Sequence, residues 1–64
     1  MISNQIVQLR KQNGWSQELL AEKLNLSRQT ISKWELGISN PNIDNLISIK
    51  KMFDVTYEFL LEQN

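Results

Sequence analysis

Apolar residues recur along the chain at intervals of three or four positions, and no stretch keeps the alternation of apolar and polar residues that a surface strand shows. This spacing is typical of helices that bury one face. Glycine and proline, which interrupt helices, occur only at Gly14, Gly37 and Pro41, and only residues 37–42 have the composition of a loop. The pattern therefore predicts an all-α domain built from short helices.

Residues that favour helix ends divide the chain into five predicted helices, which cover about residues 3–13, 17–24, 28–36, 43–53 and 57–62. Gly14 follows the basic pair Arg10 and Lys11, and it suits the left-handed conformation that often ends a helix. Polar side chains that can cap a helix N-terminus directly precede four of the predicted helices. These predicted N-caps are Ser16, Ser27, Asn42 and Thr56.

The core is predicted from the apolar residues that share one face of each helix. Trp34 falls on the same face as Ile31 and is assigned to the core, whereas Trp15 is expected to pack as a lid on the first two helices. Tyr57, Leu60 and Leu61 supply the apolar side chains of the last helix. The other residues expected to face inward are Ile2, Ile6, Leu9, Leu20, Ala21, Leu24, Ile43, Leu46, Ile49 and Phe53.

Composition narrows the class of protein. The 64 residues are enough for one small domain, and the 41% hydrophobic content argues against disorder. The sequence has no Cys and no His, so it lacks the usual zinc ligands and the usual general base, and we expect no metal, no cofactor and no enzymatic activity. The carboxylate pairs Glu18/Glu22 and Glu58/Glu62 are expected to lie on solvated helix faces. No membrane span and no signal peptide are recognisable, which favours a cytoplasmic protein.

The formal net charge is zero, but the charges are unevenly distributed. Residues 10–33 hold five basic and two acidic side chains, a net charge of +3, whereas residues 54–64 hold three acidic side chains and no basic one. A neutral total can therefore conceal a basic face. Scattered surface charge would give the same numbers, so the distribution alone does not indicate a nucleic-acid ligand.

Only Asn25, Leu26 and Ser27 separate the second and third predicted helices. Such a short connection makes two helices cross at about 90–120°, as in a helix-turn-helix. Asn25 occupies the position where the turn needs a positive φ, which asparagine tolerates well, and Ala21 is small where the helices would cross closely. The third helix would present hydrogen-bonding side chains near its exposed N-terminus, as contacts to the DNA major groove require. These residues are Arg28, Gln29, Thr30, Ser32 and Lys33.

Residues 14–37, GWSQELLAEKLNLSRQTISKWELG, resemble the helix-turn-helix of the phage-repressor/Cro (XRE) family of bacterial regulators. Residues 41–56 are similar to the fourth and fifth helices of that family, so the resemblance covers nearly the whole chain. It implies a five-helix, lambda-repressor-like domain over residues 1–64. It also implies sequence-specific binding to double-stranded DNA, usually by a symmetric homodimer on a palindromic operator, and a transcriptional regulator that most simply acts as a repressor.

The resemblance also implies roles for individual residues. Arg28, Gln29 and Lys33 match positions that contact base edges, and Thr30 and Ser32 lie beside them. Arginine and lysine favour guanine, and glutamine favours adenine. Glu35 is expected to be structural, near the crossing of the second and third helices. The residues that match phosphate-contacting positions, or lie near them, are Gln17, Asn40, Asn42 and, with a weaker case, Arg10.

Two positions depart from the family pattern. Asn25 stands where glycine is frequent, and it remains compatible with a positive φ. Lys50 stands in the fourth helix where a small apolar residue is commoner. Either its aliphatic stem runs along the edge of the core, or this face of the helix is more exposed than is usual in the family.

One small core is not expected to hide all of the remaining apolar residues. A somewhat apolar surface is common, but we favour a homodimer interface formed by the fifth helix and the loop around Ile38. Two-fold symmetry would then place two copies of the third helix about 34 Å apart. The alternative is a protein-interaction module, such as an antitoxin that binds its partner through this surface and uses DNA only for autoregulation. The residues concerned are Leu36, Ile38, Ile47, Met52, Phe59 and Leu61.

Overall fold

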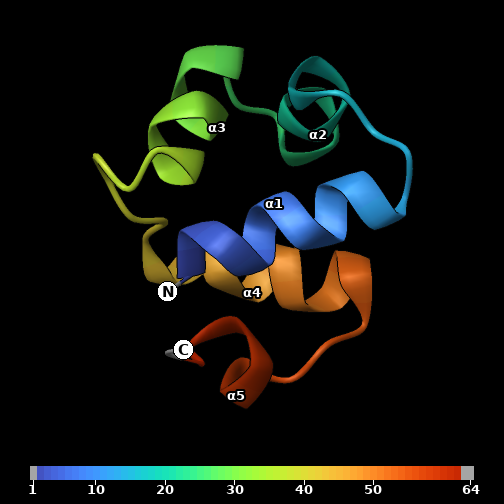
Figure 1. The fold of residues 1–64 in the computed structure, drawn as a ribbon, viewed down its shortest axis with the longest axis vertical. Coiled ribbons are helices and arrows are strands. Elements are labelled where there is room, and N and C mark those ends of the chain that lie inside the picture. The colour runs from blue at the N-terminus through green and yellow to red at the C-terminus, as the bar shows by residue number, and fades with distance from the viewer. Residues whose placement is uncertain (1, 63–64) are drawn as a thin grey trace.

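The structure is a computed structural model that describes residues 2–62, and within this range it contains five α-helices and no strand. The helices are α1 (Ile2–Gln12), α2 (Gln17–Leu24), α3 (Arg28–Glu35), α4 (Ile43–Phe53) and α5 (Tyr57–Leu60). Their ends lie within two residues of the predicted ones. In Figure 1, α1 crosses the middle of the molecule, with α2 and α3 on one side and α4 and α5 on the other. The predicted all-α architecture is confirmed.

The N-termini of α2 to α5 begin at the four predicted caps. The side-chain oxygens of Ser16, Ser27, Asn42 and Thr56 each accept a hydrogen bond from the backbone N–H three residues later. The donor–acceptor distances lie between 2.9 and 3.2 Å. Each cap satisfies one of the N–H groups that a helix leaves without an internal partner. These helix starts are therefore encoded locally in the sequence.

The C-termini of α1 to α4 share one backbone motif. Gly14, Asn25, Gly37 and Asp54 all have positive φ, between 53° and 74°. After Asn25, for example, the N–H of Leu26 donates to the carbonyl of Ala21 at 2.8 Å, the long bond of a Schellman motif. The predictions for Gly14 and Asn25 are confirmed. The left-handed conformation of Asp54 was not predicted, and it is tolerated because a short polar side chain can adopt it.

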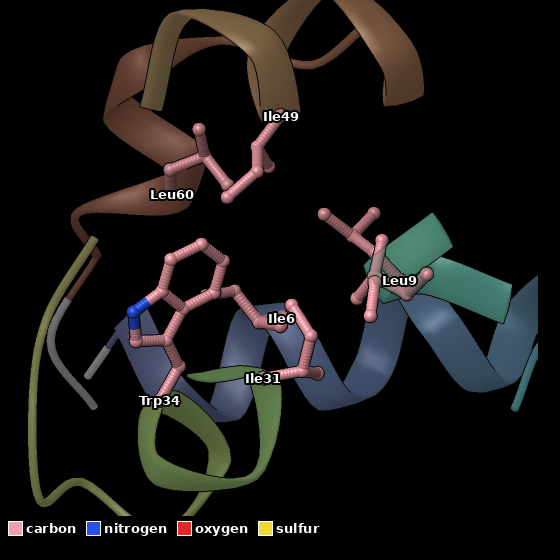
Figure 2. Packing of buried hydrophobic residues seen from close by; sticks show 8 residues of the cluster. Ile6, Leu9, Ile31, Trp34, Ile49 and Leu60 are labelled. Carbon is pink, nitrogen blue, oxygen red and sulfur yellow. The ribbon is translucent and has the colours of Figure 1, made fainter. Parts of the chain in front are cut away.

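The buried core draws on every helix. Figure 2 shows Ile31 and Trp34 from α3 pointing toward Ile6 of α1, with Ile49 of α4 and Leu60 of α5 facing them. Leu9, Leu20 and Ala21 complete the cluster of buried apolar residues. The predicted inward faces of α1, α2 and α3 are confirmed. The packing fixes α3 by its inner face and leaves its outer face free to meet a ligand.

Three side chains differ from the prediction for the core. Ile43 was expected to face inward, but it is 66% exposed because it occupies the first turn of α4, at the edge of the molecule. Met52 and Phe59 were counted as surplus apolar residues, but both pack against the buried cluster. The core is therefore larger on the α4 and α5 side than the sequence suggested, and fewer apolar side chains remain outside it.

Trp15 and Lys50 extend this picture. The ring of Trp15 packs on Phe53 of α4, with centroids 5.2 Å apart, and the ammonium of Lys23 in α2 lies 4.7 Å from the Trp15 centroid. The tryptophan thus joins α2 to α4, which the predicted lid on the first two helices did not include. Lys50 is half-buried with its ammonium 5.3 Å from the Tyr57 ring, in agreement with a stem that follows the edge of the core.

None of the helices in residues 2–62 is long and apolar enough to cross a membrane.

Candidate nucleic-acid interface

The helix-turn-helix predicted from the short connection is present. α2 packs directly against α3, and the chain reverses at Asn25, where φ is 60° and ψ is 43°. Leu26 packs against the core from the turn, and Ala21 is buried in the crossing. Ser27 then caps α3, so only three residues lie between the end of α2 and the start of α3. The turn is held by contacts on three consecutive residues, which are the backbone hydrogen bonds of Asn25 and Leu26, the packing of Leu26 on the core and the cap of Ser27.

The outer face of α3 carries the five candidate base-contacting residues. Arg28, Gln29 and Lys33 are exposed, and the half-buried Thr30 and Ser32 flank them. The hydroxyl of Thr30 lies 3.0 Å from the Ser27 hydroxyl, so it is already engaged with the N-cap. The structure therefore brings long donors and acceptors together at the N-terminal half of a helix whose opposite face is buried.

Gln17 lies at the first position of α2, and its side-chain amide is held in place. Its Nε2 donates to Oε1 of Glu35 at 3.0 Å. An amide nitrogen has two N–H bonds, so one donor remains for an external acceptor. The first N–H groups of a helix also have no internal partner, which favours an anion at this end. These features suit a contact to a phosphate.

Arg10 is the centre of a hydrogen-bond network within the protein. Its Nε and Nη2 donate to the two carboxylate oxygens of Glu35 at 2.6 and 2.9 Å, and its Nη1 donates to the carbonyl of Trp15 at 2.9 Å. The side chains are only 13% and 8% exposed. This engagement gives Arg10 a structural role. Its weaker assignment as a phosphate contact stays a prediction, since these bonds use three of the five guanidinium N–H groups. No local pattern in the sequence indicates this pair, since the two residues are 25 positions apart.

The carboxylate of Glu35 joins all three N-terminal helices. Burial raises the pKa of Glu35, but hydrogen bonds from Arg10 and Gln17 and the charges of Arg10 and Lys11 outweigh it, so the pKa lies below its usual value. The Glu35 hydrogen bond in turn raises the pKa of Arg10, against a smaller desolvation effect. Glu35 was expected to be structural near the α2–α3 crossing. The network agrees with that expectation and extends it to α1.

Asn40 and Asn42 lie at the other end of the candidate interface, in the connection between α3 and α4. Both are exposed. The Oδ1 of Asn42 accepts from the N–H of Asn45 at 2.9 Å, so this oxygen is used by the cap and the amide N–H bonds remain as donors. Within residues 2–62 no group of His, Cys, Asp or Glu side chains is arranged to hold a metal ion. The exposed amides of Asn40 and Asn42 supply hydrogen-bond donors, and the exposed Arg28 and Lys33 supply positive charge.

Known proteins are similar to this chain in sequence and in fold. A family model described as Helix-turn-helix matches residues 6–60. The chain is 46% identical over 59 residues to the HTH-type transcriptional activator BcrR of Enterococcus faecalis, covering 92% of this chain and 29% of that protein. It is 34% identical over 64 residues to the HTH-type transcriptional regulator SinR of Bacillus subtilis, covering 98% of this chain and 58% of SinR.

Solved structures give the same result. The structure of SinR, the master regulator for biofilm formation, in complex with DNA superposes with a TM-score of 0.85 at 35% identity, covering 97% of this chain and 100% of that chain. A SinR–SinI protein complex also gives a TM-score of 0.85 at 34% identity, covering 98% of this chain and 62% of that chain. The chain belongs to the Cro/XRE-like family of helix-turn-helix transcriptional regulators, as its sequence indicated. It spans between 29% and 57% of the length of the first three curated relatives.

Proposed function

We propose that this domain binds double-stranded DNA in a sequence-specific manner and regulates transcription, with α3 inserted into the major groove. The observation that carries the proposal is the polar, exposed face of α3 on a helix anchored by Ile31 and Trp34. A helix held in this way can insert into a groove without unfolding the core. The likeness to a SinR chain solved with DNA supports the same ligand.

The base contacts are assigned to the outer face of α3. Arg28 and Lys33 would donate to guanine O6 and N7, and Gln29 would pair with adenine N6 and N7. Thr30 and Ser32 would contact a thymine methyl group or a nearby phosphate. Because the Thr30 hydroxyl already bonds to Ser27, its methyl group is the part best suited to face DNA. These side chains would specify sequence.

The phosphate contacts are assigned to the two ends of the interface. Gln17 would donate its remaining amide N–H to one strand, together with the free N–H groups at the start of α2. Asn40 and Asn42 would contact the backbone from the connection before α4. Such contacts hold the helix in register on the duplex but do not distinguish sequences. Glu35 and Arg10 would act indirectly, by orienting Gln17.

We further propose that the domain binds as a homodimer through α5 and the loop around Ile38. Ile38 and Leu61 are 69% and 56% exposed, although both are large and apolar. A two-fold axis through this surface would place two α3 helices one DNA turn apart, about 34 Å, on a palindromic operator. Occupation of an operator that overlaps a promoter would exclude the polymerase, so repression is the simplest mode of regulation.

In vitro selection from a random duplex pool tests this function directly. At near-physiological salt, where loose phosphate binding is suppressed, we expect enrichment of a pseudo-palindrome with half-sites about 10 base pairs apart. Lys33→Ala should lower the affinity for the selected site. Lys51→Ala removes the same charge from an exposed position of α4 and should leave this affinity unchanged. A folded protein that enriches no sequence would contradict the proposal.

A second function is favoured by the SinR chain found in a complex with another protein. The exposed apolar side chains would then bind a protein partner, and DNA binding would serve autoregulation. The two functions differ in what Leu61→Asn does to purified protein. In the homodimer this change should lower both self-association and operator affinity, whereas in the partner-binding protein it should leave operator affinity unchanged.

A further inference from the structure

Leu36 is an exposed residue at the end of α3 to which the proposed function assigns no contact with DNA. It follows directly on α3 and its side chain is 71% exposed. The other large apolar side chains of this helix, Ile31 and Trp34, are buried. A single exposed leucine is common on protein surfaces, so its meaning depends on which neighbours it shares a face with.

The helical geometry of α3 continues through Leu36. Its backbone has φ −83° and ψ −6°, and its N–H donates to the carbonyl of Ser32 at 3.0 Å, the spacing of an α-helix. With about 100° of rotation per residue, Leu36 lies within about 20° of Gln29 around the helix axis. Lys33 lies about 40° from Gln29 on the other side. Gln29, Lys33 and Leu36 therefore form one row along the face proposed to meet DNA.

The length of this row matches a few base pairs. Seven residues of α-helix rise about 10.5 Å, which corresponds to about three base-pair steps of about 3.4 Å each. A leucine side chain donates and accepts no hydrogen bond, so it cannot hold a phosphate. The distinctive apolar group on the major-groove edge of the bases is the 5-methyl group of thymine.

We propose that Leu36 is a specificity-determining residue that contacts the 5-methyl group of a thymine in each operator half-site. The thymine lies about three base pairs from the base that Gln29 contacts. The inference rests on the proposed DNA-binding function and adds to it a requirement for an A·T pair at one position. Leu36 then contributes to base specificity through its contact with the methyl group, and it takes no part in the proposed dimer surface around Ile38.

The test replaces each operator thymine in turn by deoxyuridine, which removes only the methyl group. At one thymine per half-site, the wild-type protein should lose affinity by about four-fold for each half-site. Leu36→Ala should bind the thymine and the deoxyuridine operators equally at that position. Ile43→Ala is the matched control, because Ile43 is also large, apolar and 66% exposed but lies on α4, outside the row and outside the proposed dimer surface. It should keep the full response to the missing methyl group.

Two results would overturn the inference, and they are distinguishable. If wild type and Leu36→Ala both prefer the operator to unrelated DNA and respond to every deoxyuridine by the same factor, Leu36 contacts no methyl group and the proposed function stands. If the folded wild type does not prefer any operator to unrelated DNA, the proposed function fails, and the inference fails with it.

Discussion

The half of the molecule that contains α2 and α3 differs from the half that contains α4 and α5 in how many large apolar side chains it exposes. α2 and α3 bury Leu20, Ala21, Ile31 and Trp34 in the core, and the outer face of α3 from Arg28 to Lys33 is polar. In α4 and α5, Ile43, Tyr57 and Leu61 remain exposed, although these helices also supply Ile49 and Leu60 to the core. Both halves are helical, capped and built around the same cluster. The difference lies in what each outer face is suited to meet.

A polar outer face with long donors suits a polar, charged ligand, whereas exposed large apolar side chains suit a protein surface. The position of the charges adds to this contrast, since residues 10–33 carry a net +3 and residues 54–64 a net −3. A negatively charged duplex would be attracted by the first region and repelled by the second. The comparison thus separates the half that we propose to bind DNA from the half that we propose to associate with protein.

The largest expected effect is on the free energy of unfolding, and it contrasts a buried residue of α3 with an exposed residue of α4. Ile31→Ala removes a fully buried side chain from α3 and should destabilise the domain by about 2–5 kcal/mol. Ile43→Ala, in the exposed first turn of α4, should change the free energy of unfolding by less than about 0.5 kcal/mol. Urea unfolding followed by tryptophan fluorescence measures both. Equal losses would show that Ile43 is buried in the protein in solution.

The next effect concerns the network beneath the DNA-binding half. Arg10→Met leaves the carboxylate of Glu35 largely buried without its main partner and should cost about 2–4 kcal/mol near neutral pH. Lys51→Met, at an exposed lysine of α4, is the control and should cost little. A small loss in the Arg10 variant would mean that water replaces the guanidinium.

The same network makes stability depend on pH. The pKa of Glu35 is lowered in the folded protein from its usual value of about 4.5. Its contribution to stability is therefore fully present above that value and is lost as the pH falls through the lower, folded pKa. Unfolding free energies measured between about pH 7 and pH 3 should fall more steeply for the wild type than for Glu35→Gln. If the unfolding free energies of the two proteins depend on pH in the same way, Glu35 is not the source of the pH dependence.

A smaller effect, on DNA affinity, distinguishes the proposed base contacts from the proposed phosphate contacts. Gln29→Ala should cost about 1–3 kcal/mol on the selected operator and relax specificity at one base pair. Gln17→Ala should weaken binding about equally on all sequences, because phosphates carry no sequence information. Gln8→Ala, at an exposed glutamine of α1, serves as the control for both. If both variants weaken binding to every DNA equally, our division into base and phosphate contacts is wrong.

The smallest effect on folding belongs to the proposed dimer surface. Leu61→Asn should change the free energy of unfolding by less than about 0.5 kcal/mol, because Leu61 is more than half exposed. It should nevertheless shift the protein toward monomer in sedimentation at micromolar concentration. Ser48→Asn, another exposed position, should leave the sedimentation unchanged. A wild type that remains monomeric with and without DNA would contradict the dimer.

Most of the local architecture could be predicted because short-range interactions determine it. The hydroxyl of Ser27 caps α3 by accepting from an N–H only three residues later, and Asn25 can end α2 through its own φ. The apolar spacing of α1 likewise selects its buried face without reference to other helices. The same local logic placed Arg28, Gln29 and Lys33 on the outside of α3. Their contacts with DNA stay a prediction.

Only the tertiary structure decided which distant residues meet. Arg10 and Glu35 are separated by 25 positions, and their bidentate pairing depends on how α1 crosses α3. The packing of Trp15 on Phe53, and the exposure of Ile43 beside a buried Ile49, also depend on where α4 lies. Periodicity identifies a helix and its apolar face, but it does not say how far that face extends beyond the neighbouring helix. The sequence by itself determined the helices, their caps and the polar face of α3, because these follow from contacts within a few residues. The network that orients Gln17 and the exposed apolar surface were decided by packing between helices that are far apart in the chain.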